Sequence, residues 1–233
     1  MQDRASLLGA RIDRLEEEVR QTLQMASVIG RSFLYRLLQA VAEPGCPLDQ
    51  HLVLLQRADL VREKAVRPEL EYIFKHSLAQ EAAYRSLLLD RRREYHGRAG
   101  EALERLFADR REQLVGLLAH HFDRAEQVEK AVHYLIAAGD KARLEDALPE
   151  AARFYRRAVE RLEAAGDAAG AAEAWLKLAL VHQADFDFAA AHTAYERGFA
   201  WRQKKRRMAS RPSNERGVFR LGGCFAADGL DPG

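Results

Sequence analysis

His76 is the residue of this sequence whose setting is best suited to chemistry. The residues before it, Glu69–Lys75, alternate apolar and polar side chains, which predicts a short strand with one buried face. The residues after it have the spacing of an amphipathic helix. The imidazole is therefore expected beside the unpaired amides and positive dipole end of a helix N-terminus, a setting that suits a phosphate group. The alternative is a capping or core histidine.

The helix after His76 is expected to bury one of its faces. Ser77 is the expected cap, because a serine side chain can accept a hydrogen bond from the first amides of a helix. The apolar side chains that fall close to helical spacing on this face are Leu78, Ala82, Tyr84 and Leu88.

Two adjacent histidines, His120 and His121, raise the question of a metal site together with His133. Adjacent side chains on one helix point in different directions, and no carboxylate or cysteine follows at a suitable ligand spacing. Asp123 and Glu126 are interpreted as ordinary surface charges. We therefore expect helix packing with one exposed imidazole, and no metal site.

Nothing in the sequence resembles a catalytic centre. No serine lies in a nucleophile elbow, no HExxH occurs, and neither Cys46 nor Cys224 has surroundings that would activate a thiol. No phosphate-binding G-x-x-x-x-G-K-[ST] loop occurs, since Gly30-Arg31-Ser32 has neither the loop nor its lysine. Carboxylates such as Glu101 and Glu104 are expected on solvated helix faces. The chain is predicted to be no enzyme and to need no cofactor of its own.

Composition favours a mainly helical protein of one large or two modest domains. The 233 residues are 48% apolar and 31% charged, with only six prolines. A net charge of +2 gives no argument for a nucleic-acid partner. No apolar run approaches the length of a membrane span, and two distant cysteines suit a reduced compartment. We expect a cytoplasmic protein without a membrane partner.

Two basic runs stand out along the chain. Arg91-Arg92-Arg93 opens a predicted helix, where cations oppose the helix dipole, so an acidic partner surface is expected to compensate. Lys204-Lys205-Arg206-Arg207 could bind nucleic acid or anionic lipid, but it lacks interleaved aromatic residues beyond Trp201. A solvated linker is the favoured interpretation of the second run.

Residues 1–88 are predicted to form a winged helix-turn-helix domain, because helices followed by a β-hairpin give its order of elements. This fold often reads a DNA major groove. The candidate recognition helix, LDQHLVLLQRADL, is largely apolar, which favours packing between domains. The predicted helices are residues 6–13, 16–29, Phe33–Val41 and Leu48–Ala58, with Gly30 ending the second, and the predicted strands are Leu60–Lys64 and Glu69–Lys75.

Residues 89–112 are predicted to form a connecting helix, with Asp90–Phe107 as its helical part. Residues 113–201 are predicted to form tetratricopeptide-like helix pairs in an α-solenoid. The clearest match to that repeat is Ala174–Phe199. Its repeat-packing or partner-binding positions are Trp175, Leu178, Ala179, His182, Ala191 and Tyr195, with Gly198 also at a repeat position.

Two further stretches fit the repeat less fully. VGLLAHHFDRAEQVEKAVHYLIAA is expected to be an earlier helix pair, and ALPEAARFYRRAVERLEAAGD supplies Ala151, Tyr155 and Ala158 between the two pairs. The period is not constant, so the solenoid is expected to be irregular. Residues 202–233, basic and then glycine-rich, are interpreted as a linker or a truncated tail.

Three stretches together resemble a bacterial protein family. They are LLGARIDRLEEEVRQTLQMASVIGRSF, LEYIFKHSLAQEAAYRSLL and RRREYHGRAGEALERL, in this order before the repeats. The family is the large predicted signal-transduction ATPases of the STAND class, often carried behind a class III adenylate cyclase domain. The resemblance covers roughly residues 5–200. It implies a P-loop ATPase core, a winged helix and tetratricopeptide-like repeats that receive a signal.

The sequence departs from this family because the ATPase core and the cyclase segment are absent. We therefore expect a carboxyl-side fragment or the product of a gene broken upstream. In relatives such as NB-ARC proteins, a winged-helix histidine in a Met-His-Asp motif contacts the β-phosphate of ADP. Phe74-Lys75-His76-Ser77 is similar in position, with serine in place of the acidic residue. At the other end, Leu230–Gly233 resembles the opening of extracellular solute-binding proteins of the peptide-transporter type.

The sequence thus predicts a non-catalytic regulatory and protein-interaction fragment of a STAND-type ATPase. The repeats would bind a protein partner, and the winged helix would gate an ATPase core, with ATP or ADP entering only through that core. The alternative is a DNA-binding winged-helix regulator with the repeats as its effector domain, although a nucleic-acid partner is not expected from the charge.

Overall fold

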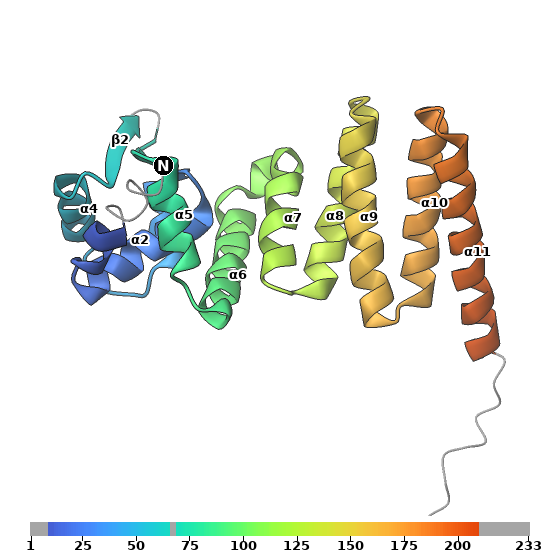
Figure 1. The fold of residues 1–233 in the computed structure, drawn as a ribbon, viewed down its shortest axis with the longest axis horizontal. Coiled ribbons are helices and arrows are strands. Elements are labelled where there is room, and N and C mark those ends of the chain that lie inside the picture. Colours follow the sequence, from blue (N-terminus) through green and yellow to red (C-terminus); the bar gives the residue numbers. More distant parts are fainter. Residues whose placement is uncertain (1–8, 66–68, 210–233) are drawn as a thin grey trace, which may run out of the picture.

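The computed structural model describes residues 9–65 and 69–209, with side chains as far as residue 204. The described chain is mainly helical with one small sheet (Figure 1). Residues 9–88, which we call the N-terminal unit, hold the sheet, and residues 89–209, which we call the helical array, follow as a row of antiparallel helices (Figure 1). No helix in the described part of the chain is both long and apolar enough to cross a membrane.

The N-terminal unit begins with a short helix at residues 9–13 and continues with helices and strands in alternation. Gly30 ends α2 at a φ of 147°, a value that favours glycine, which confirms the predicted stop. The elements after the first helix are α2 (Glu17–Ile29), β1 (Ser32–Leu34), α3 (Tyr35–Val41), α4 (Leu48–Arg57), β2 (Val61–Ala65), β3 (Glu71–Phe74) and α5 (Ser77–Arg85).

The sheet has the strand order β1-β3-β2, and both pairings are antiparallel. The predicted hairpin is confirmed, but β1 was missed, since its residues were assigned to the start of a helix. Phe33 in β1 pairs with Tyr72 and stacks on its ring at 5.9 Å, while its edge meets Phe74 at 5.9 Å. Pairing with a strand forty residues away overrides the local helical pattern here.

The buried face of α5 differs from the predicted one. The residues that pack inward are Ala79 and Ala83, while Leu78, Ala82 and Tyr84 are half-buried. Leu88 is 77% exposed. Because the small alanines face α2, the two helices can approach closely, and Gln80 Nε2 donates to the Ser27 carbonyl at 2.8 Å.

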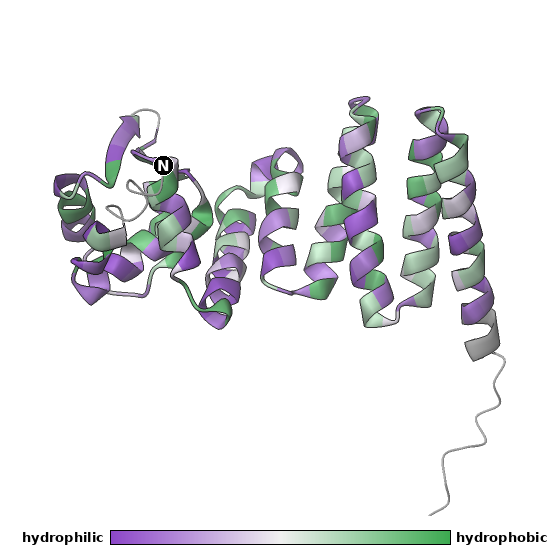
Figure 2. Ribbon diagram, in the orientation of Figure 1, coloured by the Kyte–Doolittle hydropathy of each residue, from purple (hydrophilic) through white to green (hydrophobic). Residues whose placement is uncertain are grey.

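The helical array consists of long helices joined by short turns (Figure 1). Each helix carries both hydrophobic and hydrophilic residues along its length (Figure 2). The predicted helix Asp90–Phe107 is confirmed to within one residue at each end. The elements are α6 (Leu89–Leu106), the 3-10 helix η1 (Ala108–Leu114), α7 (Val115–Arg124), α8 (Val128–Leu144), α9 (Leu148–Ala165), α10 (Ala168–Ala184) and α11 (Phe188–Ala209).

The last helix runs further than predicted. The linker was expected from residue 202, yet α11 continues to Ala209. Lysine, arginine, glutamine and alanine are good helix formers, so the basic run extends the helix. Lys204 Nζ lies 4.2 Å from the centre of the Trp201 ring. Leu230–Gly233 and the predicted turn at Arg67-Pro68 lie outside the described residues.

Glycines in the array allow aromatic rings to lie against helix backbones. A Cβ atom at Gly100 of α6 would lie 2.8 Å from the Phe122 ring of α7, and one at Gly139 of α8 would lie 2.5 Å from the Tyr155 ring of α9. These contacts join α6 to α7 and α8 to α9. The predicted helices α7 and α8 are present and pack on each other, and Tyr155, which was expected between two units, packs on α8.

Four carboxylates connect each helix of the array to the next helix but one. Glu104 of α6 accepts hydrogen bonds from α8, and Asp123 of α7 accepts them from α9. Asp140 of α8 accepts from α10, and Glu163 of α9 accepts from α11. The prediction that Glu104 and Asp123 are ordinary surface charges is wrong, since their side chains are 22% and 14% exposed.

Replacing Gly139 by alanine is expected to destabilise the array. The new Cβ would overlap the buried Tyr155 ring, and overpacking of this kind costs about 1–3 kcal/mol of unfolding free energy. Gly116→Ala is the matched control, because a Cβ there would lie 3.6 Å from Phe154, an ordinary contact. Urea denaturation of both variants tests this, and equal stability of the two would contradict the packing described.

Candidate functional site

His76 lies at the joint between β3 and α5, as predicted. It is the N-cap of α5 with an extended backbone, φ −127° and ψ 134°, and its side chain makes no capping hydrogen bond. The prediction that Ser77 is the cap is wrong, since Ser77 is the first residue of the helix. The His76 carbonyl accepts hydrogen bonds from the Ala79 and Gln80 amides at 3.1 and 3.4 Å. The exposed imidazole is therefore free to meet a group outside the unit.

Charged side chains from three parts of the N-terminal unit gather beside this joint. Lys75 forms an ion pair with Asp59, which follows α4 in a left-handed conformation. Arg11 Nη1 of the short first helix lies 4.0 Å from Asp59 Oδ2. The Lys75 hydrogen bond holds the pKa of the Asp59 carboxyl below its usual value, with Arg11 adding to the effect. The positive charges of Lys75 and Arg11, together with the positive dipole end of α5, are larger than the one negative charge of Asp59. The joint therefore favours an anion.

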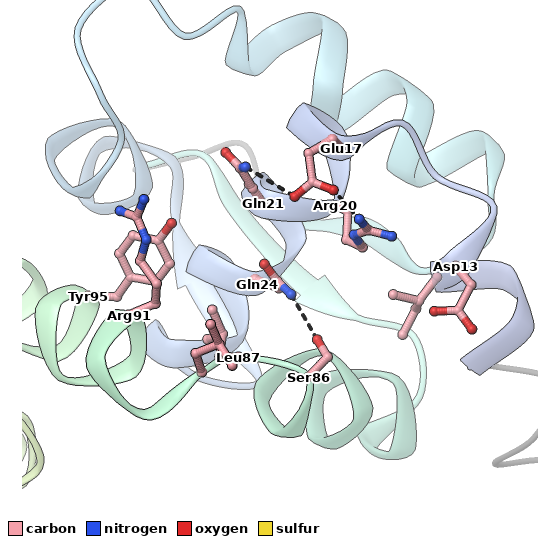
Figure 3. A pocket seen from close by; sticks show the side chains of 11 residues that line it. Asp13, Glu17, Arg20, Gln21, Gln24, Ser86, Leu87, Arg91 and Tyr95 are labelled. Carbon is pink, nitrogen blue, oxygen red and sulfur yellow. Dashed lines mark hydrogen bonds and ion pairs between the residues drawn. The ribbon is translucent and has the colours of Figure 1, made fainter.

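A groove lies on the N-terminal unit between α2 and the turn from α5 to α6 (Figure 3). Its volume is about 370 Å³, and the hydrogen bond from Gln24 Nε2 to Ser86 Oγ, 2.8 Å long, crosses it. Arg20 is paired with Glu17 and Arg91 with Glu94. Because its two arginines are already neutralised by carboxylates close in sequence, the groove has no strong preference for an anion or a cation.

A pair of histidines is buried where the N-terminal unit meets the array. His96 Nδ1 of α6 lies 3.0 Å from His121 Nδ1 of α7, and Tyr84 Oη of α5 lies 3.0 Å from His96 Nε2. His120 is exposed, which confirms the expected single exposed imidazole of its pair. No spacing in the sequence marks His96 as a partner of His121, because only the fold brings the two together. The hydrogen-bonded chain links α5, α6 and α7.

Burial keeps both histidines neutral at pH 7. It lowers the pKa of His96 to about 2 and that of His121 to about 3, with the neighbouring imidazoles adding to the effect. The cations Arg92 and Arg124 further disfavour a charge on His96. His121 Nε2 is buried without a hydrogen-bond partner. Among the described residues, no three His, Cys, Asp or Glu side chains are placed to hold a metal ion.

The arginine run at the start of α6 is compensated within the chain, so the predicted need for an acidic partner surface is not supported. Arg91 Nη1 donates to Glu94 at 3.0 Å. Arg93 Nη2 donates to Glu126 at 3.0 Å, so Glu126 is also more than a solvated charge. Arg92 donates to the Leu87 carbonyl and lies over the Tyr84 ring.

Half of the predicted repeat residues are core residues. Leu178, Ala179 and Ala191 are at most 4% exposed, so they pack helices together and are not available to a partner. The others are half-buried: Tyr195 Oη donates to Gln183 Oε1 at 3.0 Å, the Trp175 indole donates to Glu163 at 2.8 Å, and His182 lies in the last turn of α10.

Comparisons with known proteins give one relative and no family. An uncharacterized protein of Rhizobium meliloti (strain 1021) is 29% identical over 161 residues. The match covers 66% of this chain and 15% of the relative, so the chain spans a small part of that protein's length. No protein-family profile matches the chain. No solved structure matches it.

Acid is expected to destabilise the fold through the two buried histidines. Their folded-state pKa values lie below the ordinary 6.5, so between pH 6.5 and about 3 the unfolded chain binds protons that the folded chain does not. The free energy of unfolding therefore falls as the pH is lowered through this window, by about 1.4 kcal/mol per pH unit for each histidine. Urea denaturation at a series of pH values measures the slope.

His121→Leu should reduce that slope by the contribution of one histidine, about 1.4 kcal/mol per pH unit. The matched control is His133→Gln, which removes an exposed imidazole of the neighbouring helix and should leave the slope as in the wild type. A slope that stays unchanged in His121→Leu would show that the buried pair does not set the acid sensitivity.

Proposed function

We propose that this chain is a regulatory and protein-binding part of a STAND-class signalling ATPase, without catalysis of its own. In the N-terminal unit, α2, β1, α3, α4 and the β2–β3 hairpin follow one another, and β1 closes a three-stranded sheet with the hairpin. This order supports a winged helix-turn-helix, the domain that the resemblance implies after the ATPase core.

The spacing of residues in the helical array supports the prediction that it consists of tetratricopeptide-like repeats. In α8–α9, Gly139 and Tyr155 are sixteen positions apart, and in α10–α11 Ala179 and Tyr195 have the same separation. In the first pair the small residue lies against the aromatic ring of the next helix, and the equal spacing of the second pair suits the same arrangement. A repeated pair of helices that buries one face against the next pair is the building unit of a solenoid. Such arrays bind proteins along their extended surfaces.

The observation that carries the proposal is the position of the chain's first described residues. The helix at residues 9–13 reaches Asp59 through Arg11, and Asp59 is bound by Lys75, next to His76. The first described helix therefore contacts the joint that presents the exposed imidazole, and this is the joint at which an ATPase core is proposed to act. The positive end of α5 and the neighbouring cations suit the β-phosphate of an ADP held by that core.

The proposed mechanism is a switch between two arrangements of the ATPase core and the N-terminal unit. In one arrangement His76 contacts the ADP phosphate and retains the nucleotide, and in the other this contact is broken. A protein bound to the array would favour one arrangement through its differential affinity for the two. The chain's own residues contribute the imidazole and the partner surface, and the core contributes all chemistry on the nucleotide.

The exposed face of α4 supports a protein partner for the N-terminal unit more than DNA. In a winged helix this helix would be the one offered to a major groove. Val53 and Leu54 are 45% and 40% exposed there, with only Arg57 as a cation and Asp49 as an opposing carboxylate. A face of this composition suits an apolar protein surface and gives few contacts to phosphates.

The function is tested by the affinity for ADP. We expect calorimetry to detect no ADP binding to the chain alone, and to detect tighter ADP binding by a STAND ATPase core, made from an intact family member, when the chain is added. His76→Ala should weaken that binding about tenfold, the size expected for one lost hydrogen bond to a charged group. His133→Ala, an exposed histidine on α8, is the control and should have no effect.

ADP binding by the isolated chain would contradict the proposal, because it would require a nucleotide site that the chain itself provides. An equal affinity of the core for ADP with and without the chain would also contradict it. Equal losses in His76→Ala and His133→Ala would remove His76 from the mechanism.

A further inference from the structure

An apolar cavity of about 300 Å³ lies between the N-terminal unit and the helical array. One wall comes from the end of α2, β1 and α3, and the other from α6, η1 and the start of α7. Its buried lining is formed by Phe33, Leu37, Leu103 and Phe107. Leu117, which is 39% exposed, also belongs to the lining.

Few polar side chains line the cavity, and they differ in whether another side chain already neutralises them. Glu71 accepts a hydrogen bond from Lys64 Nζ at 2.8 Å and another from Ser32, so its charge is compensated. Arg110 is exposed, and its guanidinium lies 5.6 Å from the centre of the Phe107 ring. Its Nε forms an ion pair with Asp109 Oδ2 at 3.7 Å, and both side chains of this pair are exposed, so the pairing is weak. The two Nη groups of Arg110 make no hydrogen bond to a described residue, so they are the cationic donors that the cavity offers to a ligand.

An apolar concave site with a few convergent polar groups is the usual form of a small-molecule site. A volume of this size accommodates on the order of ten non-hydrogen atoms. The groove of Figure 3 differs in kind, since charged and amide side chains make up most of its lining.

We propose that this cavity binds a small amphipathic anion, a medium-chain or aromatic carboxylate whose apolar body fills the space between Phe33 and Leu103 and whose carboxylate meets Arg110. Such a ligand would contact both the N-terminal unit and the array. It would therefore stabilise their present arrangement in proportion to its concentration relative to its Kd. This inference does not depend on the proposed ATPase partner.

The test is calorimetric titration of the full chain with octanoate and, as an uncharged ligand of similar size, octanol. We expect saturable binding of both below the concentration at which octanoate forms micelles, with octanoate binding more tightly. Arg110→Gln should weaken octanoate about tenfold and leave octanol unchanged, because only the carboxylate uses the guanidinium. Arg111→Gln is the matched control, since Arg111 is on the same 3-10 helix but outside the lining.

A second variant tests the location. Leu117→Glu places a carboxylate in the lining at a partly exposed position, so the fold should tolerate it, and it should abolish octanoate binding by repulsion. The proposal is overturned if octanoate shows no saturable binding, if Arg110→Gln and Arg111→Gln weaken it equally, or if Leu117→Glu binds it as the wild type does.

Discussion

The structure of the array depends on buried or half-buried carboxylates that join each helix to the next helix but one. Asp123 of α7 is the clearest case: Arg157 Nε donates to it at 2.9 Å and Arg161 Nε at 2.5 Å, both from α9. Contacts between adjacent helices alone would leave the curvature of a row of hairpins free to vary. A bond between helices that are not adjacent fixes the angle between successive hairpins. Charge-assisted bonds of this kind are directional and stronger than neutral ones.

The N-terminal unit and the first array helices are continuous with this framework. One core of buried apolar side chains runs from Ile12 through Phe74 and Leu103 to Ala158, so the two parts share a core, with the cavity between them. The hydrogen-bonded chain of Tyr84, His96 and His121 crosses the same junction. A change in the angle between α7 and α9 would therefore be expected to shift α5 through these contacts. α5 is the helix that His76 caps. This continuity is what a switch driven by the array requires.

The sequence predicted those features that depend on local pattern. The alternation in Glu69–Lys75 gave the hairpin strand, and the apolar spacing of Asp90–Phe107 gave α6. It failed where a residue's role is decided by a partner far away in the chain. β1 is a strand because β3 lies beside it, and Asp123 is half-buried because Arg157 and Arg161 of a later helix cover it.

The candidate sites also differ in whether a local pattern in the sequence indicates them. The position of His76 at a strand-to-helix joint followed from a change of period, so it was predicted. The pairing of His96 in α6 with His121 in α7 spans 25 residues, and no spacing in the sequence indicated it. A glycine sixteen residues before an aromatic residue was a usable signal for the α8–α9 pair. The predicted repeat instead took α7 as its first helix, so this spacing fell between two units.

Hydrogen exchange of the Asp123→Asn variant shows whether the array and the N-terminal unit respond as one body. Weakening the α7–α9 bridge should lower amide protection in α7 and α9 and also in α5 and α6, because they share the core and the buried histidine chain. Loss of protection confined to α9 and the helices after it would contradict the account, since a partner on the array could then not influence His76.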